Sequence, residues 1–191
     1  MKHRYLLIPL SLFFIILTAS KCKKDRTPVD PVSQLPPETQ TGANTFGCLV
    51  DGKVFVPKGT PFGGPSLKCA YQYLNDAYSK GFYFQLSASH NHSTQNLEGI
   101  GIFTENLEIT ERTYDLEDSF QDGKAYGLYL KFEESRRIKE YTKSSLPGQL
   151  IITKFDEINQ TVSGTFWFSV AVNPGDTIKI TDGRFDMKFT K

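Results

Sequence analysis

The feature that most constrains this chain is a period-two alternation of apolar and polar residues. Apolar side chains recur at every second position in four segments, which run over residues 82–88, 126–132, 162–172 and 185–189. Because successive side chains of a strand point to opposite faces, this pattern indicates β-strands with one face buried. Turn-forming pairs separate the strands at spacings of about 8–12 residues. The sequence therefore predicts an all-β fold, a single antiparallel β-sandwich or barrel-like domain.

Individual turns and strands can be placed along the chain. Asp51-Gly52 lies between two short apolar runs and predicts a tight hairpin, since both residues tolerate positive φ. Asp182-Gly183 predicts another turn. The segment 148–155 is apolar on both faces and is expected to be a central strand. The charged stretch from Glu133 to Glu140 is expected to form one helical turn or a loop.

The N-terminus has the layout of a secretory signal peptide over residues 1–21, with a basic head and an apolar run too short to favour a membrane span. Two processing routes are open: cleavage after Ala19 or Ser20, or lipidation of Cys22. Lys21 argues against lipidation, because the position before a lipidated cysteine is normally small. Residues 22–41 are polar and proline-rich, which predicts a disordered tether before a β domain at 42–191.

Charge and cysteine count narrow the partners. Removal of the signal leaves 19 basic and 21 acidic residues, a net charge of −2, which argues against a nucleic-acid partner. If Cys22 carries a lipid, Cys48 and Cys69 remain as a pair, and an oxidising compartment favours a disulfide between them. The alternative is that both are free thiols in the core.

Three stretches carry a family resemblance: TGANTFGCLVDGKVFVP, ITKFDEINQTVSGTFWF and ITDGRFDMKF. They resemble an uncharacterised family of Bacteroidota lipoproteins that carry a domain of unknown function. The resemblance implies a Gram-negative outer-membrane location, on the periplasmic side or at the cell surface, and supports a lipid, such as palmitate, on Cys22. It transfers no catalytic residue.

Motifs for catalysis, metals and cofactors are weak. The chain has no HExxH, CxxC, GxSxG or phosphate-binding glycine loop. His90 and His92 would share a strand face, but a zinc site needs a third ligand that nothing identifies. Gly99 and Gly101 predict a bend or bulge in a strand. The acidic residues from Glu105 to Asp122 are expected to form a solvated edge. We therefore predict no metal, no cofactor and no enzyme activity.

Three aromatic residues fall on strand faces that are otherwise polar: Trp167, Tyr83 and Tyr129. Such residues can form a flat platform for a glycan or a protein partner, although a covering layer could equally bury them. The sequence therefore favours a non-catalytic binding module of the cell envelope, held to the membrane by its lipid. The alternatives are a lipocalin-like carrier of a small apolar ligand and a hydrolase that uses the acidic residues.

Overall fold

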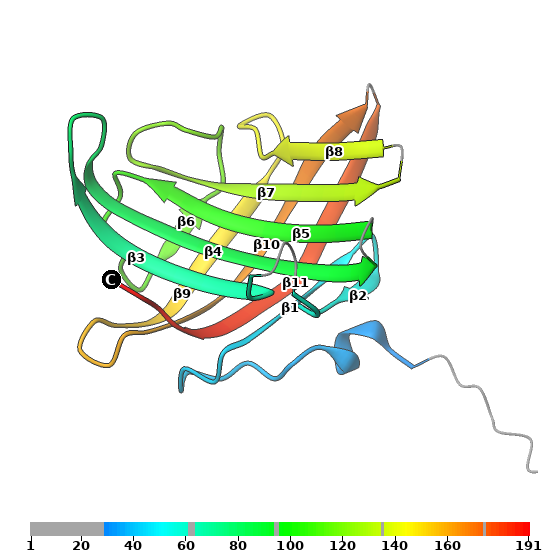
Figure 1. Cartoon of the computed structure of the whole chain (residues 1–191), viewed down its shortest axis with the longest axis horizontal. Helices are drawn as coiled ribbons and strands as arrows, with labels where there is room; N and C mark the ends of the chain where they lie inside the picture. Colours follow the sequence, from blue (N-terminus) through cyan, green and yellow to red (C-terminus); the bar gives the residue numbers. More distant parts are fainter. Residues whose placement is uncertain (1–28, 61–63, 94–95, 135, 174) are drawn as a thin grey trace, which may run out of the picture.

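Two antiparallel β-sheets pack face to face in this computed structural model, which describes residues 29–60, 64–93, 96–134, 136–173 and 175–191 (Figure 1). The predicted all-β fold is confirmed as a sandwich, and the sheets do not close into a barrel. The signal peptide and Cys22 lie outside the described residues. Within the described part of the chain, no helix has the length and hydropathy needed to cross a membrane.

Each sheet has its own strand order. The six-stranded sheet follows the order β2 (Lys53–Phe55), β1 (Thr45–Val50), β11 (Asp176–Lys188), β10 (Thr161–Asn173), β9 (Gly148–Asp156) and β6 (Thr113–Asp115). The five-stranded sheet follows the order β3 (Leu67–Asn75), β4 (Lys80–Ser93), β5 (Asn96–Glu105), β7 (Lys124–Glu133) and β8 (Arg136–Tyr141).

The predicted hairpin at Asp51-Gly52 joins β1 and β2, and both residues have positive φ, 47° and 76°. The expected central strand is β9, which pairs with β10 and β6. The prediction for residues 133–140 is wrong, because β7 and β8 form a hairpin there. The charged side chains of this segment fit β8, an edge strand that is open to water. Charges on an edge strand discourage its pairing with other chains.

The predicted turn at Asp182-Gly183 is also wrong, since both residues lie within β11. Pairing with β10 shifts register there: Phe166 pairs with Gly183, whereas Phe168 pairs with Ile180. An extra residue on one strand is a β-bulge, and Asp182 takes the positive φ of 53° that the bulge requires. The bulge resets the alternation, so that side chains on both halves of β11 face the core.

Aromatic rings fill the space between the sheets. Phe166 and Phe168 are fully buried and lie 6.3 Å apart between ring centroids. Glycines make room for them, because a Cβ on Gly127 would lie 3.1 Å from the Phe168 ring and a Cβ on Gly183 only 2.5 Å from Phe166. Gly183 lies beside Phe166 in the same sheet, whereas the approach of Gly127 to Phe168 crosses between the sheets and joins them into one core.

The predicted disordered tether is wrong for its second half. Pro31–Gln34 form a 3₁₀ turn, η2, whose N-cap Asp30 accepts a hydrogen bond from the Val32 N–H. The next residue, Leu35, is buried and packs with Pro36 against Gly47 of β1, where a Cβ would lie 2.6 Å from the Pro36 ring. Prolines that suggested a flexible linker therefore fix an extended segment on the outer face of the six-stranded sheet.

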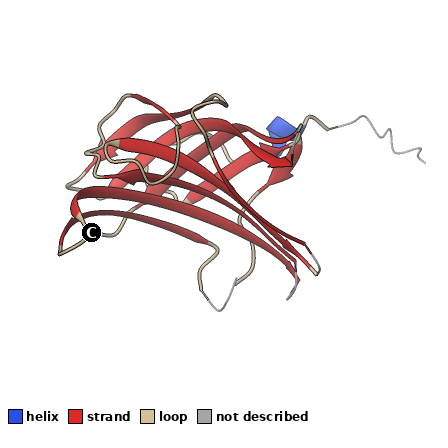
Figure 2. Cartoon of the chain, turned by 90° about the horizontal axis from the view of Figure 1, so that it is seen from above, coloured by secondary structure: helices blue, strands red, loops and turns tan. Residues whose placement is uncertain are grey.

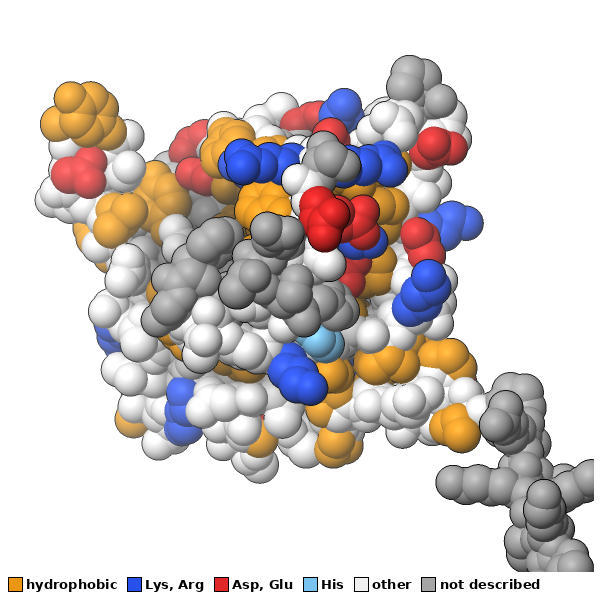
Figure 3. Space-filling model, turned by 45° about the vertical axis from the view of Figure 1, so that its right-hand side comes forward, with side chains coloured by type: hydrophobic (Ala, Val, Ile, Leu, Met, Phe, Trp, Pro, Cys, Tyr) orange, Lys and Arg blue, Asp and Glu red, His pale blue; other side chains and the backbone are white. Residues whose placement is uncertain are grey.

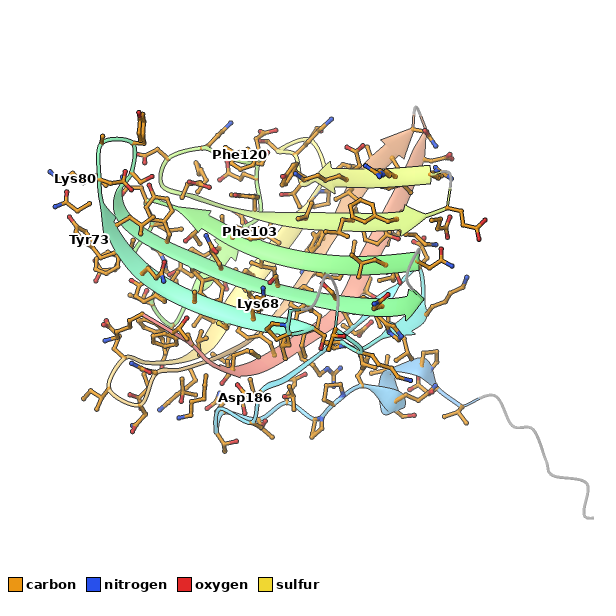
Figure 4. The ribbon with its side chains drawn as sticks, viewed as in Figure 1. Lys68, Tyr73, Lys80, Phe103, Phe120 and Asp186 are labelled. Carbon is orange, nitrogen blue, oxygen red and sulfur yellow. The ribbon has the colours of Figure 1, made fainter. Side chains whose placement is uncertain are left out.

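One carboxylate fastens this segment. Asp186 of β11 is almost fully buried and accepts hydrogen bonds from the backbone N–H groups of residues 41, 42 and 43, at 2.7–3.1 Å, and from the Thr39 and Ser163 hydroxyls (Figure 4). Burial alone would raise the pKa of Asp186, but these hydrogen bonds hold it well below its ordinary value. The ionised carboxylate thus clamps the N-terminal segment to the sheet.

The predicted Cys48–Cys69 disulfide is absent, and both residues are buried free thiols. Cys48 lies in β1 and Cys69 in β3, on different sheets. Facing sheets lie about 10 Å apart, whereas a disulfide needs Cα atoms within roughly 7 Å. Burial raises the pKa of both thiols, and for Cys48 the nearby Glu98 adds to the effect.

We predict that Asp186→Asn lowers the free energy of unfolding by about 2–3 kcal/mol at pH 7. The NH₂ group of the asparagine would face N–H and hydroxyl donors that the carboxylate accepts from in the wild type. The depressed pKa means that Asp186 stabilises the fold above its ordinary pKa of 3.8 and loses this effect as the pH falls toward the folded-state pKa. Urea unfolding at pH 7 and pH 3 measures both effects. The wild type should lose more stability between these pH values than Asp186→Asn, and the exposed Asp182→Asn is the control. Equal pH dependence of wild type and Asp186→Asn would contradict the clamp.

We predict that Cys48 and Cys69 resist iodoacetamide at pH 8 in the native protein and react fully in denaturant, since burial both shields the sulfurs and suppresses the thiolate. Mass spectrometry of the alkylated peptides measures this. A non-reduced digest that contains the two cysteines in one cross-linked peptide would disprove free thiols.

Candidate functional site

A cleft of 820 Å³ opens between the sheets at one end of the sandwich. The hairpins β1–β2 and β10–β11 line one side, and β4–β5 and β7–β8 line the other. The hairpins of the two layers stand apart at the end where η2 lies (Figure 2). With this end turned forward, basic and acidic side chains gather on its surface (Figure 3). The charged residues of the lining are Asp51, Lys53, Glu98, Lys131, Glu133, Arg136 and Asp176.

The cleft opens because the inward-facing side chains of β5 and β7 change from apolar to charged along the strands. Ile100 of β5 pairs with Tyr129 of β7, and both belong to the core. The next inward pair toward this end is Glu98 and Lys131. Charged side chains are too costly to bury between packed sheets, so the apolar core stops at this level and water enters.

Tyr129 and Glu98 form the floor of the cleft. The Tyr129 hydroxyl donates a 2.7 Å hydrogen bond to the Glu98 carboxylate, and Tyr129 is only 2% exposed. Burial raises the pKa of Tyr129, and the hydrogen bond to Glu98 and the nearby Asp51 and Glu133 raise it further. The phenol therefore remains a neutral donor at physiological pH. One hydroxyl does not fill the acceptor sites of a carboxylate, so Glu98 keeps capacity for a ligand.

The walls carry both signs of charge. Lys131 and Glu133 form a 2.7 Å ion pair on β7. Across the cleft, Asp51 accepts a hydrogen bond from the Lys179 N–H, which fixes its carboxylate in the β1–β2 turn. Four acidic and three basic side chains line the cleft, so donors and acceptors are interleaved with little net charge.

The three predicted aromatic residues do not form one surface, so the predicted platform is wrong. Tyr129 faces the other sheet, Tyr83 is half-buried on the outer face of the five-stranded sheet, and Trp167 lies on the outer face of the six-stranded sheet. The alternation in β7 was identified correctly, but its faces were reversed. Tyr126 and Leu128, expected inside, point outward, because Gly127 and Tyr129 face Phe168 and the core.

Trp167 is exposed as the sequence suggested, with 39% of its surface accessible. Trp167 lies in β10 and pairs with Gln149 of β9. It borders a hollow of 470 Å³ that Glu38 and Arg184 also line. Trp167 is therefore a single exposed ring and not part of an aromatic cluster.

The histidines and the acidic residues that the sequence offered as candidates do not form a metal site in the described part of the chain. His90 lies in β4 near Phe55, with ring centroids 6.3 Å apart, while the side chain of His92 is outside the described part of the chain. The described residues contain no group of three metal-ligating side chains. Much of the acidic stretch forms the loop before β7, where Lys124 pairs with Glu117 at 2.7 Å.

Glu98 and Lys131 were not predicted as site residues. Glu98 gave a signal in the sequence, because it interrupts an apolar face that continues with Ile100 and Ile102, whereas Lys131 lies on the face of β7 that was expected to be polar. The site could not be recognised without the pairing of β5 with β7, which places the two residues side by side.

Comparison with known proteins adds no relative: no family model, no curated protein and no solved structure matches the chain.

Proposed function

We propose that this protein is a non-catalytic, lipid-anchored binding domain of the cell envelope and that the cleft holds its ligand. The 820 Å³ cleft, with the Tyr129–Glu98 pair at its floor, is the observation that carries the proposal. Its volume falls within the range of about 300–1,000 Å³ that is typical of ligand pockets.

The lining favours a neutral, polyhydroxylated ligand, a short oligosaccharide. Sugar hydroxyls both donate and accept hydrogen bonds, which suits walls where acidic and basic groups alternate. Glu98 would accept from a hydroxyl while Lys53 and Arg136 would donate to others. A strongly charged ligand would meet repulsion from one sign or the other in this lining.

The alternatives have less support. An apolar carrier needs an enclosed apolar cavity, whereas this cleft is open and charged, and phenylalanine rings fill the space between the sheets. A hydrolase that uses the acidic residues from Glu105 to Asp122 has less support, because none of them is among the described residues that line the cleft.

The proposed lipid on Cys22 would lie near the end of the sandwich where the cleft opens. The η2 turn lies beside β2, at the end of the sandwich where the cleft opens (Figure 1). A lipid on Cys22 would reach η2 through about eight residues, a span of at most roughly 30 Å. The proposed anchor therefore keeps the cleft close to the membrane surface.

We predict that Cys22→Ser releases the protein from the membrane fraction, because a thioether-linked lipid requires that sulfur. Cell fractionation with immunoblotting measures the distribution, and mass spectrometry of the N-terminal peptide identifies the modification. Retention of Cys22→Ser in the membrane fraction would count against the lipid anchor and would leave the cleft unaffected.

We predict that Glu98→Gln weakens binding of a neutral oligosaccharide by tenfold or more, in line with about 1.5–3 kcal/mol for a hydrogen bond to a charged group. Calorimetric titration of the detergent-solubilised full chain with neutral, amino and acidic trisaccharides measures the affinity. Glu157→Gln is the matched control, because Glu157 lies in the β9–β10 hairpin beside Lys191, outside the cleft. No binding of any trisaccharide, or an equal loss in Glu157→Gln, would refute the proposal.

A further inference from the structure

A second surface lies on the outer face of the five-stranded sheet, away from the cleft. Four aromatic rings are contiguous there, and we call them the ring surface: Phe103, Phe120, Tyr126 and Tyr141. Tyr126 is buried at the centre, only 4% exposed, with centroid distances of 5.3–5.9 Å to the other three rings. These positions face outward because Ile102 and Ala125, their neighbours along the strands, belong to the core. Phe103 and Phe120 are labelled in Figure 4.

Phe120 combines an exposed ring with a strained backbone conformation. It is 65% exposed and has a φ of 60°, a conformation that is rare for a bulky side chain. The loop that carries it is fixed at both ends. The Glu117 N–H donates to the Ala125 carbonyl at 2.9 Å, and the Gly123 N–H donates to the Glu105 carbonyl at 2.7 Å. Backbone strain combined with an exposed ring on a fixed loop points to function.

The Phe103 ring lies over Gly101 of its own strand. A Cβ on Gly101 would lie 2.4 Å from this ring, so the glycine is what allows the ring to cover β5. The predicted bend or bulge at Gly99 and Gly101 is therefore wrong: β5 keeps regular register there, and Leu130 and Phe103 occupy the space above the two glycines. Phe103 and Tyr126 are nearly parallel, with 24° between their ring planes, whereas Phe120 is inclined by 51° to Tyr126.

Hydrogen-bonding groups border the rings. Glu105 accepts a 2.9 Å hydrogen bond from the Tyr126 hydroxyl. Gln85 pairs with Phe103 across β4 and β5, and the half-buried Tyr83 lies two residues before Gln85 on the same face. Polar side chains thus border the ring surface.

We propose that the ring surface binds a polysaccharide chain, which extends over the outer face of the sheet. Sugar rings present flat C–H faces that stack on aromatic rings, while their hydroxyls need hydrogen-bond partners at the edge of the stack. Phe120 and Phe103 supply the stacking faces, and Glu105 and Gln85 supply the partners. A protein partner would bury the same rings in the apolar core of an interface, and it is the alternative that the test must separate. This surface is separate from the cleft and does not depend on the function proposed for it.

The test is affinity electrophoresis of the detergent-solubilised full chain in native gels that contain an uncharged polysaccharide, namely a β-glucan, a xylan or a mannan. At least one polymer should slow the wild type, and Phe120→Ala should raise the dissociation constant at least tenfold. Because Phe120 is exposed, its variant should keep the wild-type melting temperature. Trp167→Ala removes a partly exposed ring from the opposite sheet and should migrate as the wild type does.

Other outcomes overturn the proposal. They are retardation by no polymer, retardation that survives Phe120→Ala, and retardation that Trp167→Ala removes. Self-association of the wild type that Phe120→Ala abolishes, seen by sedimentation without retardation, would make the ring surface a protein interface. Glu98→Gln should leave retardation unchanged, so this assay separates the ring surface from the cleft.

Discussion

The packing of phenylalanine rings between the two sheets is the constraint on which the rest of the structure depends. Phe166 and Phe168 of β10 fill the space between the layers, and glycines on the neighbouring strands leave room for them. Rings of this size bury much apolar surface, and they tolerate little displacement in a close-packed interior. The bulge at Asp182 belongs to the same arrangement, because without it one half of β11 would turn its apolar residues to solvent.

The cleft exists where this packing stops. Between Ile100 and Glu98 the inward face of β5 changes from apolar to charged, and β7 changes at the same level, from Tyr129 to Lys131. The position of the cleft is thus a consequence of where the core ends, and the Tyr129–Glu98 hydrogen bond marks the boundary. A site built on strands and backed by a filled core is preorganised, which limits the cost of ordering on binding.

The N-terminal segment that precedes β1 is fixed to the sandwich. Asp186 binds the segment through a cluster of hydrogen bonds, and Leu35 and Pro36 pack against Gly47. Force or motion at a lipid on Cys22 would therefore reach the sandwich through a short length of chain. With the cleft at the end where η2 lies and the ring surface on a broad outer face, the two proposed sites would meet different surroundings.

The sequence by itself determined most of the strands, the hairpin at Asp51-Gly52 and the antiparallel all-β class, because period-two alternation and positive-φ turn residues act locally. The choice between a sandwich and a barrel came only from the tertiary structure. It did not determine which face of β7 is buried, since Tyr126 and Tyr129 are equally plausible core residues until β10 supplies Phe168 opposite Gly127. The prolines at 31–37 were misleading for the same reason: only contact with Gly47 and Asp186 turns an extended segment into a fixed one.

Glu98 shows the same division between sequence and tertiary structure. Its charge on an apolar strand face was visible in the sequence, but its role depends on the cross-strand pair with Lys131 and on the Tyr129 hydroxyl. The ring surface likewise unites Phe103, Phe120, Tyr126 and Tyr141 from two adjacent strands, a loop and an edge strand. Local propensity decides what each segment becomes, whereas contacts between segments distant in sequence decide which residues meet, and only the folded arrangement of the sheets supplies those contacts.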